Sequence, residues 1–332
     1  MTQLVLSHDM RAPDFGTPPA ELYQAALDQC EWADRLGFHT ATFMEHHASA
    51  DGYLPSPIIL ASAVAARTRK MLLELRVMLL PLYHPVRAAE DLAVLDIISG
   101  GRLRLTFGAG YRWEEYDQYG LDFRKRPSLM ERGIQTLKSA WSGEPFEFEG
   151  KTIRILPRPV QRPHPPIQIG GSSKAAAERA ARIADGYYPP RAVFYQDYVD
   201  ALAREGRVAP GPGPRGAYVY LHVSNDPAKT WRQVSPHALY ENNEYARWLS
   251  VKGQGDKAIY RPVTDADELR GSYKIVTPDE CVEMARKDGT LVFKPLLSGL
   301  DPAIAWDNLR LFESEVLPRI GALTPPGPFL RG

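Results

Sequence analysis

The stretch from Leu79 to Tyr119 limits the possible folds more than any other part of the chain, because it reads as a strand end, a turn, a helix and a second strand. Pro85 stands where the first turn of a helix tolerates proline. The helix is predicted to run from about Val86 to Ser99, because Gly100 easily adopts the left-handed conformation that ends a helix. Residues 102–108 then alternate between apolar and polar side chains, as a strand does. This order predicts a β-α-β unit of a parallel sheet.

The same alternation of strands and helices is predicted along most of the chain. The predicted strands are residues 3–7, 39–44, 72–80, 102–108, 167–170, 186–188, 217–223 and 291–297. The predicted helices are residues 20–36, 57–69, 86–99, 128–141, 173–184 and 194–204. Eight strands with helices between them predict an α/β fold, the (β/α)8 TIM barrel, in which functional sites lie at the carboxyl ends of the strands.

Two segments interrupt this alternation. Residues 142–166 contain a run that alternates about Glu149-Gly150 as a hairpin does, followed by a proline-rich return, and we interpret them as an insertion. Residues 224–290 show no clear strand or helix signal, and a stretch of that length is usually a lid or a disordered loop. The 332 residues, 44% of them hydrophobic, are expected to form one barrel domain.

The composition narrows the classes of partner and compartment. Forty basic and forty acidic side chains cancel, which disfavours nucleic acid and anionic membranes and favours a small organic molecule. Cys30 and Cys281 show no paired spacing, so we expect a reducing, cytoplasmic location. No charged start precedes an apolar run, and no segment approaches the roughly 18 apolar residues of a membrane span.

Glu45, His46 and His47 follow the predicted second strand, where side chains point into the mouth of a barrel. Adjacent residues on an extended chain face opposite ways, so at most one histidine is expected to reach a ligand. An imidazole there can act as an acid or a base near neutral pH. The alternative is a hydrogen-bonded pair of histidines that only holds the loop.

Two glycine-containing turns are candidate cofactor sites. Gly170, Gly171, Ser172 and Ser173 follow a predicted strand and open a predicted helix, so their amides and hydroxyls either bind a phosphate or form a plain turn with a helix-capping serine. The run Gly108–Gly110 invites a dinucleotide interpretation. Trp113 stands where the third glycine of that fingerprint belongs, which disfavours a nicotinamide fold.

The remaining charged residues are interpreted as structural. The histidines His8, His46, His47 and His84 do not form the His-x-His or His-Glu-x-x-His patterns of metal hydrolases, so no metal is expected. Glu74, Arg76 and Arg104 occupy alternate strand positions. Ion pairing among them is favoured, because an isolated buried charge is very costly.

The predicted helix 86–99 is apolar on more than one face, and residues 111–119 form an aromatic loop. An outer helix of a monomeric barrel needs only one apolar stripe, so the extra surface predicts either a homodimer that buries Leu92 and Val94 or their neighbours, or a contact within the chain. The aromatic loop carries Tyr111, Trp113, Tyr116 and Tyr119. These side chains either line an apolar substrate pocket or pack the loop on the barrel.

The chain resembles the bacterial-luciferase-like flavin-dependent monooxygenases in three segments that occur in the order of that family. The segments are ADRLGFHTATFMEHH, PLYHPVRAAEDLAVLDIISGGRLRLTFGAGYRWEEYDQYG and PHPPIQIGGSSKAAAERAARIADGY. The resemblance covers about residues 1–190, is faint from 191 to 275 and returns weakly in the last helix. It implies an enzyme that binds reduced flavin mononucleotide (FMN) and uses O2 to oxidise a small organic substrate. A separate flavin reductase and a homodimer are implied as partners.

The resemblance also assigns roles to individual positions. His46 is the implied catalytic residue, and a non-proline cis peptide is implied at Arg76–Val77, where relatives commonly have small residues. Bacterial luciferase has a phosphate-binding arginine at the position of Ala109, so Arg112 becomes the candidate cation. The implied cofactor-binding residues are Arg76, Val77, Gly108, Ala109, Gly110, Gly170, Gly171, Ser172 and Ser173. The candidate substrate-contacting residues are His47, Tyr111 and Trp113.

Two alternatives to the monooxygenase interpretation stay open. One is a reductase or dehydrogenase that uses a deazaflavin, because that branch shares the fold and the phosphate site. The other is a non-catalytic flavin-binding or light-emission accessory protein, against which the presence of His46 argues.

Overall fold

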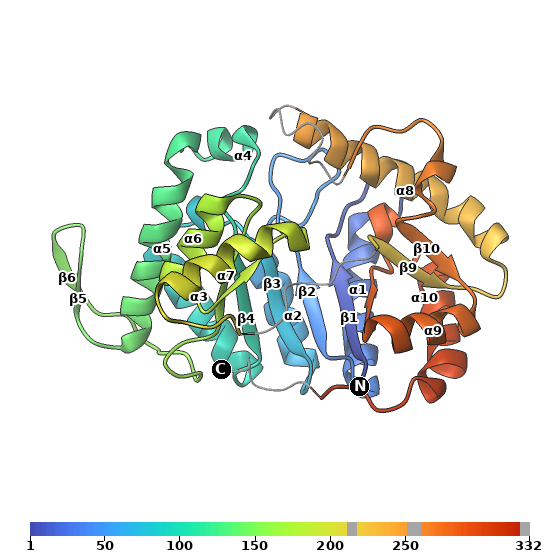
Figure 1. The fold of residues 1–332 in the computed structure, drawn as a ribbon, viewed down its shortest axis with the longest axis horizontal. Coiled ribbons are helices and arrows are strands. Elements are labelled where there is room, and N and C mark those ends of the chain that lie inside the picture. The colour runs from blue at the N-terminus through green and yellow to red at the C-terminus, as the bar shows by residue number, and fades with distance from the viewer. Residues whose placement is uncertain (211–217, 251–259, 326–332) are drawn as a thin grey trace. The chain divides into compact units, whose positions relative to one another are not determined.

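The computed structural model describes residues 1–210, 218–250 and 260–325, and the chain divides into two compact units. The first unit consists of Met1–Ala41, Ser49–Pro55 and Ala217–Pro325. Within the described part of the chain, the second consists of Thr42–Ala48 and residues 56–210. Figure 1 shows the helices and strands of both units.

The first unit contains parallel strand pairs flanked by helices. Strand β1 pairs with β11 from Gln3↔Thr290 to Leu6↔Phe293, and β9 pairs in parallel with β10. Its elements are β1 (Gln3–His8), α1 (Pro19–Leu36), β9 (Tyr220–Val223), α8 (Pro227–Ser250), β10 (Tyr273–Val276), α9 (Pro278–Asp288), β11 (Thr290–Phe293) and α10 (Pro302–Leu311).

The second unit contains a parallel sheet in which β3 pairs with β4, β4 with β7, and β7 with β8. Its elements are α2 (Pro57–Arg67), β3 (Leu72–Met78), α3 (Pro85–Ser99), β4 (Leu103–Phe107), α4 (Trp113–Gln118), α5 (Arg126–Ser142), β5 (Phe146–Phe148), β6 (Lys151–Ile153), β7 (Ile167–Gly170), α6 (Lys174–Ile183), β8 (Gly186–Tyr188) and α7 (Tyr195–Arg204). Strand β2 (Thr40–Phe43) ends in this unit.

Local sequence signals explain the β3-α3-β4 unit. Pro85 occupies the first turn of α3, and Gly100 ends the helix with φ 67°, a conformation that a side chain would make unfavourable. Leu73 and Leu75 of β3 lie opposite Leu103 and Leu105 of β4, so the predicted apolar positions are in register and buried. The β-α-β unit predicted from these residues is therefore confirmed.

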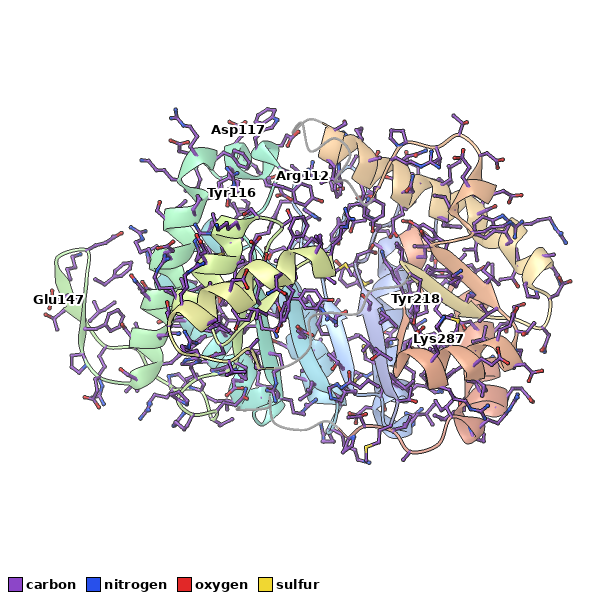
Figure 2. The ribbon with its side chains drawn as sticks, in the orientation of Figure 1. Arg112, Tyr116, Asp117, Glu147, Tyr218 and Lys287 are labelled. Atoms are coloured by element: carbon purple, nitrogen blue, oxygen red, sulfur yellow. The ribbon has the colours of Figure 1, made fainter. Side chains whose placement is uncertain are left out.

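The segment after α5 contains an antiparallel pair. Strands β5 and β6 pair from Phe146↔Ile153 to Phe148↔Lys151, around a turn at Glu149 and Gly150 in which both residues have positive φ. Figure 2 shows Glu147 on this hairpin.

The segment 224–290 differs from the prediction of a lid without regular structure. Its described residues form α8, β10 and α9, and β10 continues the parallel pairing with β9. The 24-residue α8 is polar and has Pro236 in its interior. A proline inside a sequence normally predicts the end of a helix, so this helix could not be recognised from the sequence pattern. Residues 251–259 lie outside the described part of the chain. Strand β11 also ends at Phe293, earlier than the predicted 297.

None of the described helices is both long and apolar enough to cross a membrane.

In helix α3, Leu92 is fully buried by its own chain, whereas Val94 is 43% exposed. Leu92 is therefore part of the core of the second unit, and of the two residues named in the prediction only Val94 is exposed for a contact with a partner subunit.

Candidate active site

The candidate site is built where two strands of the second unit end. The run Glu45–His47 follows β2, and Gly108–Tyr111 follows β4 and leads into α4. The carboxyl ends of parallel strands meet at one edge of a sheet, which brings the two runs together. All three side chains of Glu45–His47 are buried.

His46 is the centre of a three-residue hydrogen-bonded set. Its Nδ1 lies 2.6 Å from Oε1 of Glu115, and its Nε2 lies 3.2 Å from the hydroxyl of Tyr111. The rings of His46 and Tyr111 also pack edge to face, with centroids 5.2 Å apart. Neither Glu115 nor its pairing with His46 was predicted, since 69 residues separate the two.

Glu115 is ionised in this set although it is fully buried. Burial opposes its charge, but hydrogen bonds from His46 and the amide of His47, together with the nearby Arg112, outweigh burial and lower the pKa of Glu115. An ionised carboxylate only accepts hydrogen bonds, so His46 must carry its proton on Nδ1. A neutral His46 with that proton has an acceptor at Nε2, to which the hydroxyl of Tyr111 can donate.

His47 belongs to a second set with the same order of residue types. Its Nε2 lies 2.7 Å from Oε1 of Glu45 and its Nδ1 lies 3.1 Å from the hydroxyl of Tyr119. Glu45 also accepts hydrogen bonds from the hydroxyl of Tyr83 and the amide of Leu79. Both nitrogens of His47 therefore contact protein groups, which assigns this residue to the support of the loop.

Arg112 also holds the loop after β2. Its guanidinium donates to the carbonyl oxygens of His47 and Ala48, at 2.7 and 3.1 Å, and lies 3.8 Å from Glu115. The side chain is buried, and Figure 2 labels it. We therefore interpret Arg112 as an anchor of this loop and not as the phosphate-binding cation considered from the sequence.

The sequence predicted that the aromatic residues after β4 lie on one loop. The structure differs, because a short helix, α4, begins within this segment. Trp113 begins helix α4 and is 50% exposed, Tyr116 is buried on the same helix, and Tyr119 follows it and is 46% exposed. The hydroxyl of Tyr116 donates to the carbonyl of Ala109 at 2.6 Å. Tyr116 thus packs the segment, while Tyr111 and Trp113 stay candidates for contact with a ligand.

The cis peptide predicted at Arg76–Val77 is confirmed. It coincides with a shift of register in the β3–β4 pairing between Arg76 and Met78. A Cβ atom on Gly108 would lie 2.4 Å from Val77, and one on Gly170 would lie 3.3 Å from Val77. These two glycines therefore make room for Val77, so their small size is needed by the fold itself.

The charged strand residues pair only in part as predicted. Arg76 lies 3.4 Å from Glu74, and its guanidinium stacks 4.7 Å above the ring of Tyr188. Arg104 donates instead to the amide oxygen of Gln161 at 2.8 Å. The Glu74–Arg76 pair confirms the core ion pairing, and Arg76 places a cation beside the ends of β3 and β8.

The turn between β7 and α6 presents exposed polar groups at a helix N-terminus. Ser173 is the N-cap of α6 and accepts a hydrogen bond from the amide of Ala176, while Ser172 is exposed. Gly171 is required here, because a Cβ atom would lie 2.6 Å from Ala176. Free amides and hydroxyls at the start of a helix suit the phosphate of a flavin.

A second charged cluster, in the first unit, was missed from the sequence. The ammonium group of Lys294, just after β11, contacts Asp9 at 2.6 Å and also Glu241 of α8. Asp9 further approaches Arg11, whose guanidinium pairs with Asp51. The rings of Tyr53, Tyr245 and Trp248 surround Arg11 at 4.5 to 4.7 Å. Asp9 follows closely after the predicted strand 3–7, and that position was the signal that the sequence offered.

Metal binding finds no support in the described residues, since no three of their histidine, cysteine, aspartate or glutamate side chains gather around a possible ion. Of the histidines considered together from the sequence, His8 lies against Cys30 at 3.6 Å and His84 packs on Phe148.

The parallel strands and their helices define an α/β fold, and comparison with known proteins gives the family of the chain. A family model described as "Luciferase-like monooxygenase" matches residues 4–286. The chain belongs to the luciferase-like monooxygenase family, as its sequence motifs predicted, and the predicted fold class is confirmed.

Individual relatives support an oxidoreductase. The FMNH(2)-dependent dimethylsulfone monooxygenase of Pseudomonas putida is 33% identical over 167 residues, 47% of this chain and 46% of the relative. An F420-dependent glucose-6-phosphate dehydrogenase of Nakamurella multipartita is 29% identical over 95% of this chain and 96% of its own. With several relatives, the match spans only about half of the relative's length.

Solved structures share the fold. The oxygenating constituent of 3,6-diketocamphane monooxygenase from Pseudomonas putida, in complex with FMN, superposes with a TM-score of 0.75. The match has 18% identity and covers 97% of this chain and 99% of that one.

Proposed function

We propose that this protein is the oxygenating component of a flavin-dependent monooxygenase, which oxidises a small organic molecule with O2 and reduced FMN from a separate reductase. The observation that carries the proposal is the hydrogen-bonded set of the buried Glu115 and His46 with the half-buried Tyr111 at the strand ends. Similarity to monooxygenases that use reduced FMN supports it.

The residues of this chain would bind and orient the flavin and shield it from water. The exposed amides and hydroxyls at the start of α6 suit the phosphate, and the Arg76–Val77 segment would support the flavin ring. Reduced flavin supplies the electrons that activate oxygen, and the protein supplies orientation and exclusion of water. His46, with its proton held on Nδ1 by Glu115, is placed to act through Tyr111 on a bound molecule.

A deazaflavin-dependent oxidoreductase is the second candidate, because the F420-dependent relative matches almost the whole chain. The deciding experiment supplies chemically reduced FMN and O2 with a panel of small organic substrates, and runs a parallel anaerobic assay with a deazaflavin. We expect oxygen uptake and an oxygenated product in the first assay. Turnover confined to the anaerobic deazaflavin assay would reject the monooxygenase proposal.

The phosphate site gives a prediction about cofactor affinity. Replacing Ser172 and Ser173 by alanine should weaken FMN binding by about 1–3 kcal/mol, because hydrogen bonds to a charged group are lost. Riboflavin lacks the phosphate and should bind both proteins alike. A fluorescence titration measures both ligands, with the Ser128→Ala/Ser142→Ala protein on α5 as the control. Equal losses for the two ligands would argue against a phosphate site here.

The outer face of α3 gives a prediction about assembly. Val94, Ile97 and Ile98 are 40–48% exposed, so we propose that they form the interface of a homodimer. Replacing Ile97 and Ile98 by aspartate should yield a monomer in light scattering at micromolar concentration, since two charges would be buried. Val208→Asp, at a side chain that is 91% exposed, should leave the dimer intact. A monomeric parent protein would disprove the interface.

A further inference from the structure

His46 does not offer a ring nitrogen directly to a ligand in this structure, since protein groups occupy both of them. Nδ1 donates to the carboxylate of Glu115 at 2.6 Å, and Nε2 accepts from the hydroxyl of Tyr111 at 3.2 Å. Any proton that passes between His46 and a bound molecule by this route must pass through Tyr111. The half-buried Tyr111 lies at the end of the run that follows β4.

We propose that Tyr111 is the residue that exchanges a proton with the bound substrate, and that His46 and Glu115 are positioning residues behind it. The proposal rests on the proposed function and adds a residue and a substrate class to it. The substrate would carry an ionisable O–H or an acidic C–H group and would react as its anion.

The proton balance of the relay is simple. The substrate transfers one proton to the phenolic oxygen of Tyr111, while the proton of Tyr111 moves to Nε2 of His46. The substrate becomes an anion and His46 becomes an imidazolium ion, and Tyr111 is neutral before and after. Glu115 stays ionised and stabilises the new positive charge across 2.6 Å. Return of the proton from His46 through Tyr111 restores the starting state.

The direction of this transfer follows from the surroundings of Glu115. Its carboxylate is fully buried, and its Oε1 accepts from His46 and from the amide of His47 at 3.1 Å. The fixed negative charge of Glu115, 2.6 Å from Nδ1, attracts the positive charge that the ring gains when it takes up a proton. The relay is therefore arranged to take up a proton from the ligand.

The chain contains its own matched control. Glu45, His47 and Tyr119 repeat the order acid, histidine, tyrosine at 2.7 and 3.1 Å. Tyr119 is 46% exposed, however, and Glu45 is tied to Tyr83 and the amide of Leu79. This second set supports the loop, so loss of the Tyr119 hydroxyl should not affect the reaction.

The first test reads the proton position on His46 and needs no substrate. Nitrogen-15 NMR of histidine-labelled protein, with His46→Gln to assign the signal, should show Nδ1 protonated and Nε2 accepting a hydrogen bond. Tyr111→Phe should shift the Nε2 signal, and Tyr119→Phe should leave it in place. A proton on Nε2 of His46 in the parent protein would overturn the relay.

The second test uses the substrate found in the oxygen assay. Tyr111→Phe should lower kcat about 100-fold while KM changes less than about threefold, and Tyr119→Phe should stay within about threefold of the parent. Glu115→Gln should lower kcat at least about tenfold. The protein that carries both Tyr111→Phe and Glu115→Gln should be no slower than the protein with Tyr111→Phe alone. FMN titration of each variant checks that the fold is intact.

The outcomes separate the two proposals. The relay is wrong, while the monooxygenase proposal stands, in either of two cases. In the first, Tyr111→Phe keeps kcat within about threefold of the parent. In the second, the fold losses of kcat from Tyr111→Phe and Glu115→Gln multiply in the double variant. If the parent protein turns over nothing with reduced FMN and O2, the proposed function fails together with the step assigned to Tyr111. In that case the NMR result still shows whether the hydrogen-bonded set exists.

Discussion

Replacing Lys294 by methionine is expected to lower the free energy of unfolding by about 3–5 kcal/mol, because it leaves buried carboxylates without their cation. Lys294 is 5% exposed and contacts Asp9 and Glu241, which are themselves almost fully buried. The hydroxyl of Tyr273 donates to Glu241 at 3.0 Å but carries no charge to replace the ammonium group. Denaturation by urea measures the loss.

The pH dependence of the loss identifies its cause. Burial opposes the charges of Lys294 and Asp9, but their mutual attraction outweighs it, so the pKa of Lys294 is raised and that of Asp9 is lowered. The contribution of Asp9 is present above the unfolded pKa of about 3.9 and is lost as the pH falls through the lower folded value. That of Lys294 is present below about pH 10.4 and is lost as the pH rises through the higher folded value. In the parent protein, Asp9 and Lys294 should therefore give little pH dependence from pH 5 to 9.

The variant should behave differently across the same range. Burial alone raises a carboxyl pKa, as it already does for Glu241. Without Lys294, the folded state should hold more protons than the unfolded state above about pH 4, so stability should fall as the pH rises. The deficit should be smaller at pH 5 than at pH 8.

Two further proteins complete this experiment. Adding Glu241→Gln to Lys294→Met should recover part of the loss, since one uncompensated charge is removed. Arg261→Met, which removes an exposed ion pair with Glu268, should change stability by less than about 1 kcal/mol. A Lys294→Met protein as stable as the parent at pH 8 would show that the cluster is not needed for stability.

The sequence predicted elements whose signals are local. Pro85 and Gly100 marked the ends of α3, and two-residue alternation marked β4. Helix α4 was missed because its six residues, rich in aromatic side chains, are too short for a periodic pattern. Helix α8 was missed because a proline interrupts a polar helix that tertiary packing nevertheless stabilises through buried residues such as Trp231 and Val234.

The candidate site was predictable to a smaller extent. Strand ends indicated the run Glu45–His47, and the family resemblance alone selected His46 within it and predicted the cis peptide at Arg76–Val77. The partner of His46 could not be found, because Glu115 is brought to it by the tertiary fold across 69 residues. Arg112 was a reasonable candidate for phosphate by charge, yet its hydrogen bonds go to two backbone carbonyls that no sequence pattern shows.

The same limit applies to surfaces. An apolar helix can be recognised from sequence, but which of its apolar residues face the core depends on the neighbours. Leu92 is buried against the second unit, whereas Val94 and Ile97, close to it in sequence, are exposed. The proposed interface therefore consists of the exposed face of α3 and does not include Leu92.

His46→Ala should separate flavin binding from productive use of oxygen. The side chain is bonded to Glu115 and Tyr111, so its removal breaks the relay but leaves the proposed phosphate site at α6 intact. FMN should bind as it does to the parent protein. Product formed per reduced FMN consumed should fall about 10²–10³-fold, which is the usual size of a lost acid–base contribution, with hydrogen peroxide released instead.

The measurement is parallel quantification of oxygen, product and peroxide after mixing with chemically reduced FMN. His84→Ala serves as the control, because His84 is exposed and its ring packs on Phe148. The control should keep the parent ratio of product to peroxide. If His46→Ala also keeps that ratio, His46 has no part in the reaction, and the relay through Tyr111 fails with it. If instead His46→Ala no longer binds FMN, the histidine supports the cofactor site, and its proposed role in the oxygen reaction must be withdrawn.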